Sequence, residues 1–152
     1  MADGASGLQV ISVADPAAPR VVGGADTPGH ASGVYVSDLR AYVADGDRGL
    51  QIIDVMHPSS PTGVGEVDMP GSSGGVYLSG STAFVANGDD GLRAIEVKEP
   101  AATRWVGAVA TPGRAYDVYV SGNLAYVAAG DGGLVIVRIT RHRIYLPALS
   151  SR

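Results

Sequence analysis

The chain has 152 residues, a formal net charge of −4 and no cysteine, which excludes disulfides, thiolate catalysis and cysteine-based zinc sites. Its 22 glycines and 9 prolines argue against long helices, because both residues destabilise helix interiors. No apolar run reaches the ~18 residues of a membrane-spanning helix, and the acidic balance argues against a nucleic-acid partner.

A 42-residue repeat organises the sequence. Residues 7–48 match residues 49–90 at 21 positions without a gap. We therefore expect copies at 7–48, 49–90 and 91–132, a partial copy at 133–140, and a C-terminal strand or tail at 141–152. A period of about 40–45 residues that carries several short strands is typical of a four-stranded propeller blade.

Short β-branched and aromatic runs bounded by turn residues predict the strands in chain order. The chain opens on the third strand of a blade at Leu8, with no first or second strand before it, and a weak fourth strand follows near 21–23. In the next unit we expect the first three strands at 33–37, 41–44 and 50–55, and later copies repeat them. The predicted fold class is all-β, with propeller blades of four antiparallel strands in about three and a half 42-residue repeats, a partial propeller.

An open array of blades leaves unpaired strand edges at both ends, which favours aggregation. Three explanations stand side by side: the chain belongs to a longer propeller, two copies close one ring, or the stack is open and capped. In the two-copy ring, residues 8–26 of one copy would complete the last blade of the other, in competition with the strand at 134–139. If the chain is a fragment of a longer propeller, we expect the isolated chain to be poorly soluble or to form oligomers through its open strand edges.

One segment and several shorter motifs resemble the LVIVD repeat, which is named for its Leu-Val-Ile-Val-Asp third strand. They are Gly-Leu-Gln-Ile-Ile-Asp-Val-x-x-Pro-x-x-Pro at 49–61, Val64-Gly65, Pro70-Gly71, Gly75-Val76-Tyr77 and Ala83-Phe84-Val85-Ala86. The resemblance covers essentially residues 7–140. It implies a β-propeller, usually on exported or surface proteins, with no common enzymatic activity. We therefore expect an extracellular or cell-surface location, although residues 1–6 do not form a signal peptide.

The turn between the second and third strands places oxygen side chains at alternate positions, as a calcium-binding loop does at its start. The calcium candidates are Asp45, Asp47, Asn87 and Asp89. The third copy has Ala129 at the first ligand position, and Asp-Gly and Asn-Gly are also ordinary hairpin turns. The hairpin interpretation is favoured, so we expect no metal site and no cofactor.

No nucleophile–base pair stands out in the repeats, so we predict that the chain is not an enzyme. The predicted function is a non-catalytic repeat scaffold that binds a protein or a surface polymer, as part of a longer exported or cell-surface propeller. The alternative is a propeller-based enzyme or calcium-binding domain with its site at the channel mouth, because fold alone does not decide function. Further blades or a second copy of the chain are additional expected partners.

The predicted contact surface is one rim, where the fourth-to-first connections meet the second-to-third turns. A Pro-Gly pair recurs in each connection, whereas the next position changes between His30, Ser72 and Arg114. Variable side chains on a fixed backbone are how repeat proteins build binding surfaces. The residues predicted to contact a partner are Asp47, Asp89, Asp131, Arg114, Tyr116 and Asp117.

Overall fold

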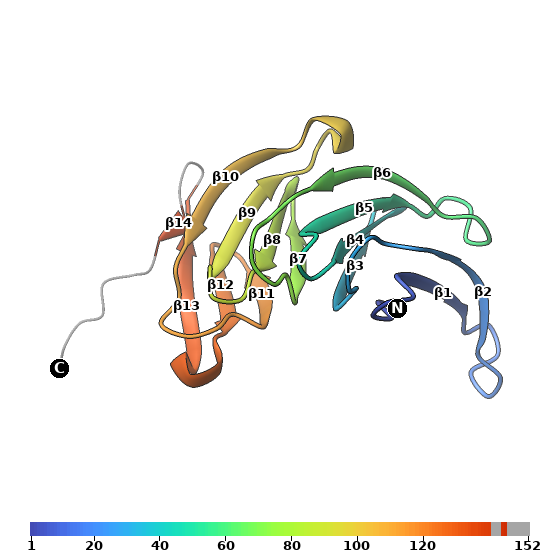
Figure 1. The fold of residues 1–152 in the computed structure, drawn as a ribbon, viewed down its shortest axis with the longest axis horizontal. Coiled ribbons are helices and arrows are strands. Elements are labelled where there is room, and N and C mark those ends of the chain that lie inside the picture. The colour runs from blue at the N-terminus through green and yellow to red at the C-terminus, as the bar shows by residue number, and fades with distance from the viewer. Residues whose placement is uncertain (141–143, 146–152) are drawn as a thin grey trace.

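Four antiparallel sheets follow one another along an arc in the computed structural model, which describes residues 1–140 and the backbone of residues 144 and 145 (Figure 1). The described residues contain no α-helix and two short 3-10 helices, Pro100–Ala102 and Gly130–Gly132. Within this part of the chain, no helix is long and apolar enough to cross a membrane. The prediction of an all-β, partial-propeller fold is confirmed.

The first sheet has two strands and each of the others has four, hydrogen-bonded in chain order. The half-blade consists of β1 (Leu8–Ser12) and β2 (Arg20–Ala25). Blade 1 consists of β3 (Gly33–Ser37), β4 (Arg40–Ala44), β5 (Leu50–Asp54) and β6 (Thr62–Val67). Blade 2 consists of β7 (Val76–Ser79), β8 (Thr82–Ala86), β9 (Leu92–Glu96) and β10 (Arg104–Val109). Blade 3 consists of β11 (Asp117–Ser121), β12 (Leu124–Ala128), β13 (Leu134–Ile139) and β14 (Ile144–Tyr145).

The fourth strands of the half-blade and of blades 1 and 2 are longer than their weak sequence signal indicated. β2, β6 and β10 have six residues each, and most of their residues are not buried. In all three, a register shift interrupts the pairing with the third strand, for example between Ile52 and Ile53 of β5. The register shift and the glycines within these strands interrupt the alternation of apolar and polar side chains from which a strand is predicted.

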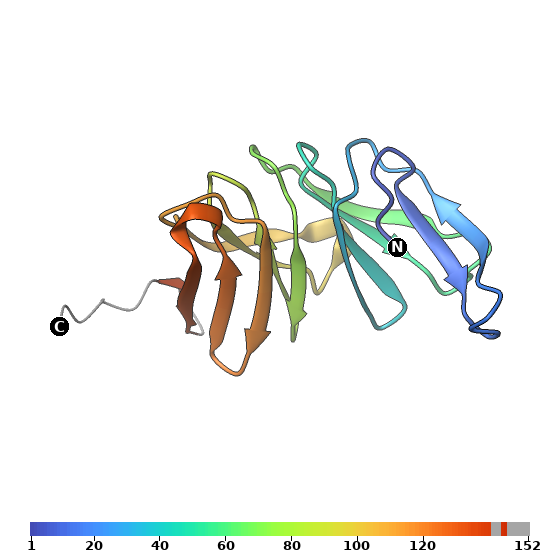
Figure 2. The same cartoon turned by 90° about the horizontal axis from the view of Figure 1, so that it is seen from below.

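The blades bury their side chains against one another. The first strands β3, β7 and β11 lie side by side on the concave side of the arc, and the fourth strands β6 and β10 run along its convex side (Figures 1 and 2). Tyr42 and Ile52 of blade 1 belong to one buried cluster with Leu78 and Ile95 of blade 2. Both faces of an internal sheet are therefore covered, which explains why apolar residues occupy successive positions in the second and third strands.

The residues before β1 repeat the turn that joins the second and third strands of a blade. Ala2 forms an antiparallel bridge with Leu8, as the last residue of β4 pairs with the first residue of β5. Residues 2–8 (Ala-Asp-Gly-Ala-Ser-Gly-Leu) repeat residues 44–50 (Ala-Asp-Gly-Asp-Arg-Gly-Leu). The prediction that the chain opens on a third strand at Leu8, with no first or second strand before it, agrees with the described elements, because only isolated bridges precede β1.

At the other end, β14 pairs with β13 through Arg138–Tyr145 and Ile139–Ile144. It takes the place that the fourth strand has in the other blades. In a two-copy ring, residues 8–26 of a second copy would have to displace the strand at 134–139 and, with it, β14. The rest of the tail predicted at 141–152, residues 141–143 and 146–152, lies outside the described residues.

Candidate partner-binding rim

The rim is built from second-to-third turns and from entry loops, the connections that lead into the first strand of each blade. Gly46 in the blade 1 turn exchanges two backbone hydrogen bonds with Ser73 in the blade 2 entry loop, of 3.2 and 2.9 Å. Gly88 and Ala115 repeat this contact at the next junction, with bonds of 3.0 and 2.9 Å. Both turn glycines have a left-handed conformation (φ 60° and 59°), which a residue with a Cβ atom adopts at a cost. The rim therefore has the same backbone at each junction.

Asp45 joins the blade 1 turn to the entry loop of its own blade. Its side chain is fully buried. The Oδ1 atom accepts a hydrogen bond of 2.6 Å from the Thr27 hydroxyl, and Oδ2 accepts one of 2.9 Å from the Gly29 amide. A buried carboxylate must be paired in this way, because an unpartnered one is costly. The sequence suggested a calcium ligand here, and the structure places both oxygens on protein donors.

Asn87 has the equivalent position in blade 2 and is also fully buried. Its Oδ1 atom accepts a hydrogen bond of 2.8 Å from the Ser73 hydroxyl, and its Nδ2 atom donates one of 2.7 Å to the Pro70 carbonyl. In blade 3 the position is Ala129, and the Thr111 hydroxyl donates to Gly113 of its own entry loop instead (2.6 Å). Two of the four calcium candidates are thus loop supports. Among the described residues, no three histidine or acidic side chains come close enough to hold a metal ion.

All six residues predicted for the rim are exposed, and the structure brings three of them together. The Nη1 atom of Arg114 lies 3.2 Å from Oδ2 of Asp89. Its guanidinium carbon lies 5.9 Å from the centroid of the Tyr116 ring, within the range of a cation–π contact. Asp47 and Asp131 lie in the turns of blades 1 and 3 and are not part of this cluster.

Asp117, the sixth rim residue, lines a hollow of about 360 Å³ where the first strands of the three blades begin. The hollow is lined by equivalent repeat positions of three blades: Ser32, Gly33, Val34, Gly74, Gly75, Val76, Tyr116 and Asp117. A Cβ atom on Gly75 would overlap the Asp117 side chain, so glycine is what allows this carboxylate to approach blade 2. The Asp117 carboxylate accepts a hydrogen bond of 2.9 Å from the Val118 amide.

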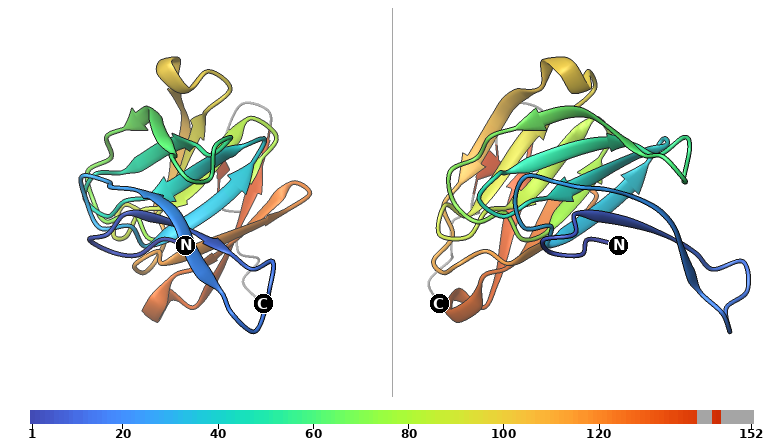
Figure 3. Two further views of the ribbon diagram at one scale, coloured as in Figure 1. Left: turned by 90° about the vertical axis from the view of Figure 1, so that its right-hand side faces the viewer. Right: turned by 45° about the vertical axis from the view of Figure 1, so that its right-hand side comes forward.

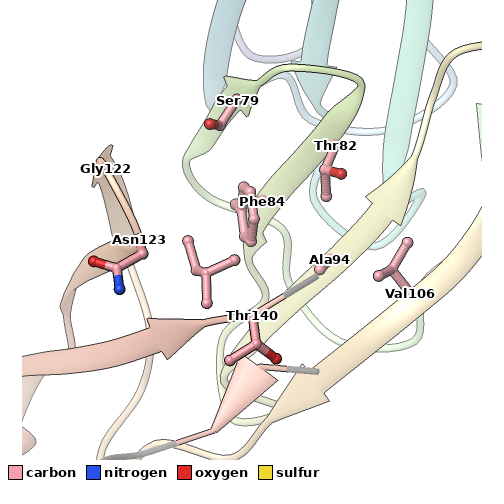
Figure 4. Close-up of a pocket in the computed structure, with 9 residues that line it drawn as sticks. Ser79, Thr82, Phe84, Ala94, Val106, Gly122, Asn123 and Thr140 are labelled. Carbon is pink, nitrogen blue, oxygen red and sulfur yellow. The ribbon is translucent and has the colours of Figure 1, made fainter. Parts of the chain in front are cut away.

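A second cavity, of about 270 Å³, opens between blades 2 and 3 at the ends of the strands opposite the rim (Figure 4). It is lined by Ser79, Thr82, Phe84, Ala94, Val106, Gly122, Asn123, Ile139 and Thr140. Ala94 has the repeat position of Ile52, which fills the corresponding space in blade 1. The lining has hydroxyl, amide and apolar groups but no charged side chain. Nothing in the sequence indicates this cavity, because a single alanine within a strand is unremarkable.

Comparison with known proteins supports the fold and assigns the family. No curated protein matches the chain. Among solved structures, the chain is similar in fold to the computationally designed Ika8 protein, with a TM-score of 0.65 at 7% identity over 82% of this chain and 38% of that chain. The LVIVD repeat family matches residues 28–69, 70–111 and 112–140. The first two matches each begin in an entry loop and continue through the four strands of one blade, so a family repeat corresponds to a blade. The chain belongs to the LVIVD repeat family.

Proposed function

We propose that the chain is a non-catalytic repeat scaffold that binds a macromolecular partner, a protein or a surface polymer, through the rim. The observation that carries this proposal is the cluster of Asp89, Arg114 and Tyr116 on a backbone that is the same at each junction. At the preceding junction, the positions of Arg114 and Tyr116 are Ser72 and Gly74. The same backbone therefore carries an ion pair and an aromatic ring at the junction of blades 2 and 3, and small residues at the junction of blades 1 and 2.

The exposure of the cluster supports a role in partner contact rather than in stability. The Asp89 side chain is 85% exposed and that of Arg114 is 42% exposed. Exposed ion pairs of this kind contribute about 0–1 kcal/mol to folding. Arginine and tyrosine are also among the residues that dominate binding energy in protein interfaces, because both combine a large contact area with polar groups.

We further propose that the chain is part of a longer exported or cell-surface propeller. The family resemblance supports this location. Fractionation of the source cells, followed by detection with an antibody against the chain, is expected to find the protein in the surface or extracellular fraction. Detection in the cytoplasm alone would contradict the proposal.

The binding proposal is tested by comparing rim and control variants of the full chain. The partner is first captured from a surface extract of the source cells and identified, and its affinity is then measured with purified material. The double variant Arg114→Ala/Tyr116→Ala is expected to bind at least about tenfold more weakly than the wild type. The control is Leu39→Ala/Met56→Ala, because both side chains are 57% exposed in turns at the opposite ends of the strands. Unchanged affinity of the rim variant would refute the proposal.

A further inference from the structure

The hollow of about 360 Å³ beside Asp117 lies where the first strands of blades 1, 2 and 3 begin. It is lined by three equivalent segments of the repeat, 32–34, 74–76 and 116–117. The half-blade lies at the near end of the row of blades in the left view of Figure 3, and neither of its strands lines the hollow. The walls of the hollow therefore come from three consecutive blades.

Each segment has a backbone carbonyl that accepts no hydrogen bond from the described part of the chain. These carbonyls belong to Ser32, Gly74 and Tyr116. The amides of the same residues donate to the last residue of the second strand in their own blade, as Gly74 does to Ala86 (2.9 Å). The amide of Ala86 donates to Gly75 in return (2.9 Å), so the pairing passes over the Gly74 carbonyl.

Two of these carbonyls lie against the preceding blade. A Cβ atom on Gly33 would lie 2.5 Å from the Gly74 oxygen, and a Cβ atom on Gly74 would lie 2.6 Å from the Tyr116 oxygen. A side chain at either glycine would therefore displace the carbonyl of the next blade. The glycines keep these backbone oxygens in the wall of the hollow.

Asp117 adds a negative charge to the same wall. It is the charged residue among those that line the hollow, and its equivalents in blades 1 and 2 are Gly33 and Gly75. Among the described residues, no basic side chain is paired with Asp117, and Arg114 is paired with Asp89 instead. An ionised carboxylate accepts several hydrogen bonds, so Asp117 has acceptor capacity left for a ligand.

A primary ammonium group matches this set of acceptors. It has three N–H donors, no acceptor and a positive charge. The hollow has one carboxylate and, in the same wall, backbone carbonyls that lack a donor. A calcium ion is a poorer match, because it takes about six to eight oxygen ligands, and no second acidic side chain lines the hollow.

We infer that the hollow is a subsite for a lysine side chain of a protein partner, with its ammonium group held by the Asp117 carboxylate and by the carbonyls of Gly74 and Tyr116. The apolar stem of the lysine would pack on Val34 and Val76, which also line the hollow. This inference rests on the proposed function and deepens it, because Tyr116 belongs both to the rim cluster and to the lining of the hollow.

The first test measures binding of a small probe, Nα-acetyl-lysine methylamide, to the full chain. Nuclear magnetic resonance follows the amide signals of Gly33 and Gly75 during the titration. We expect saturable shifts with this probe and binding at least about tenfold weaker for the norleucine analogue, which has no ammonium group. The trimethyllysine analogue keeps the charge but has no N–H donor, and it is also expected to bind at least about tenfold more weakly.

Two variants of the chain locate the subsite. Asp117→Asn removes the charge but keeps the size of the side chain and an oxygen that can accept the Val118 amide. It is expected to weaken binding of the lysine probe at least about tenfold. The control is Asp38→Asn, which removes the same charge at an exposed position in the turn between β3 and β4, and it should leave the affinity unchanged.

The second test uses the partner captured by the full chain. Asp117→Asn is expected to weaken its binding at least about tenfold, and Asp38→Asn is expected to leave it unchanged. Acetylation of the partner's lysines should weaken binding to the wild type in the same way, because it removes the positive charge.

The remaining outcomes separate the subsite from the proposed function. No binding of the lysine probe, or equal binding of the lysine and norleucine probes, overturns the inference. Equal binding of the trimethyllysine probe also overturns it, because charge alone would then attract the ligand. If Arg114→Ala/Tyr116→Ala weakens partner binding and Asp117→Asn does not, the lysine subsite is wrong and the proposed function stands. If the partner is insensitive to the rim variant, the proposed function is refuted, and the probe titration by itself decides whether the hollow takes an ammonium group.

Discussion

The carboxylate of buried Asp45 accepts a hydrogen bond of 2.9 Å from the amide of Gly29, 16 residues earlier in the chain. This bond attaches the second-to-third turn of blade 1 to the entry loop of the same blade. The neighbouring residue in the turn, Gly46, is bonded to the entry loop of the following blade. One five-residue turn therefore joins two consecutive entry loops and fixes the backbone of the rim.

Removing the Asp45 carboxylate is expected to destabilise the fold. In Asp45→Ala, the Thr27 hydroxyl and the Gly29 amide lose their acceptor, and the free energy of unfolding should fall by about 1.5–3 kcal/mol. Urea unfolding measures this change. Asp47→Ala, at an exposed position of the same turn, should stay within about 0.5 kcal/mol of the wild type. Equal effects of the two substitutions would show that Asp45 does not support the loop.

Two glycines in β6 should differ sharply in their tolerance of alanine. A Cβ atom on Gly65 would overlap the backbone carbonyl of Pro100 in blade 2, whereas Gly63 has no atom within 4 Å of that position. Gly65→Ala is expected to cost about 1–3 kcal/mol because blade 2 must move. Gly63→Ala should be neutral or slightly stabilising. Thermal melting of both variants checks the contact between blades, and equal melting temperatures would contradict it.

Equivalent apolar positions should differ in their contribution to stability according to whether a preceding blade covers them. Leu78→Ala removes a side chain that is 8% exposed and is expected to cost about 2–5 kcal/mol. Val36→Ala, at the same repeat position, truncates a side chain that is 59% exposed and should change stability by less than about 0.5 kcal/mol. A large loss of stability in Val36→Ala, measured by urea unfolding, would contradict the prediction.

Tyr77 should make stability depend on pH in the alkaline range. Burial, and then the neighbouring phenols of Tyr35 and Tyr119, raise the pKa of Tyr77 above its ordinary value. The rings lie close together, with centroid distances of 4.8 and 5.0 Å. Because folding favours the neutral phenol, its contribution is present below the ordinary tyrosine pKa of about 10 and is lost as the pH rises through the raised value.

The measurement is the free energy of unfolding at several pH values between about 9 and 11. The wild type should lose stability more steeply over this range than Tyr77→Phe, which has no phenol to ionise. Tyr116→Phe is the control, since Tyr116 is 56% exposed on the rim. Identical pH profiles for the wild type and Tyr77→Phe would contradict the prediction.

The sequence predicted the blades well because a 42-residue period and short β-branched runs are local signals. It did not predict which polar groups pair in the turns and entry loops. Alternating oxygen side chains in the turn left calcium binding at Asp45 as the alternative to a hairpin turn, because a carboxylate can bind a cation or accept amide hydrogen bonds. Only the position of Gly29 in space separates these two roles. Arg114 and Asp89 are 25 residues apart in different blades, so the sequence placed both on the rim without showing that they pair.

The most direct test of the proposed function is site-specific photo-crosslinking of the full chain to its captured partner. A benzoylphenylalanine is introduced in place of Tyr116 on the rim, or in place of Pro16, Pro58 or Pro100 in the turns at the opposite ends of the strands. We predict a covalent adduct with the partner from position 116 and none from the three proline positions. Adducts from the proline positions alone would contradict the assignment of the rim as the contact surface.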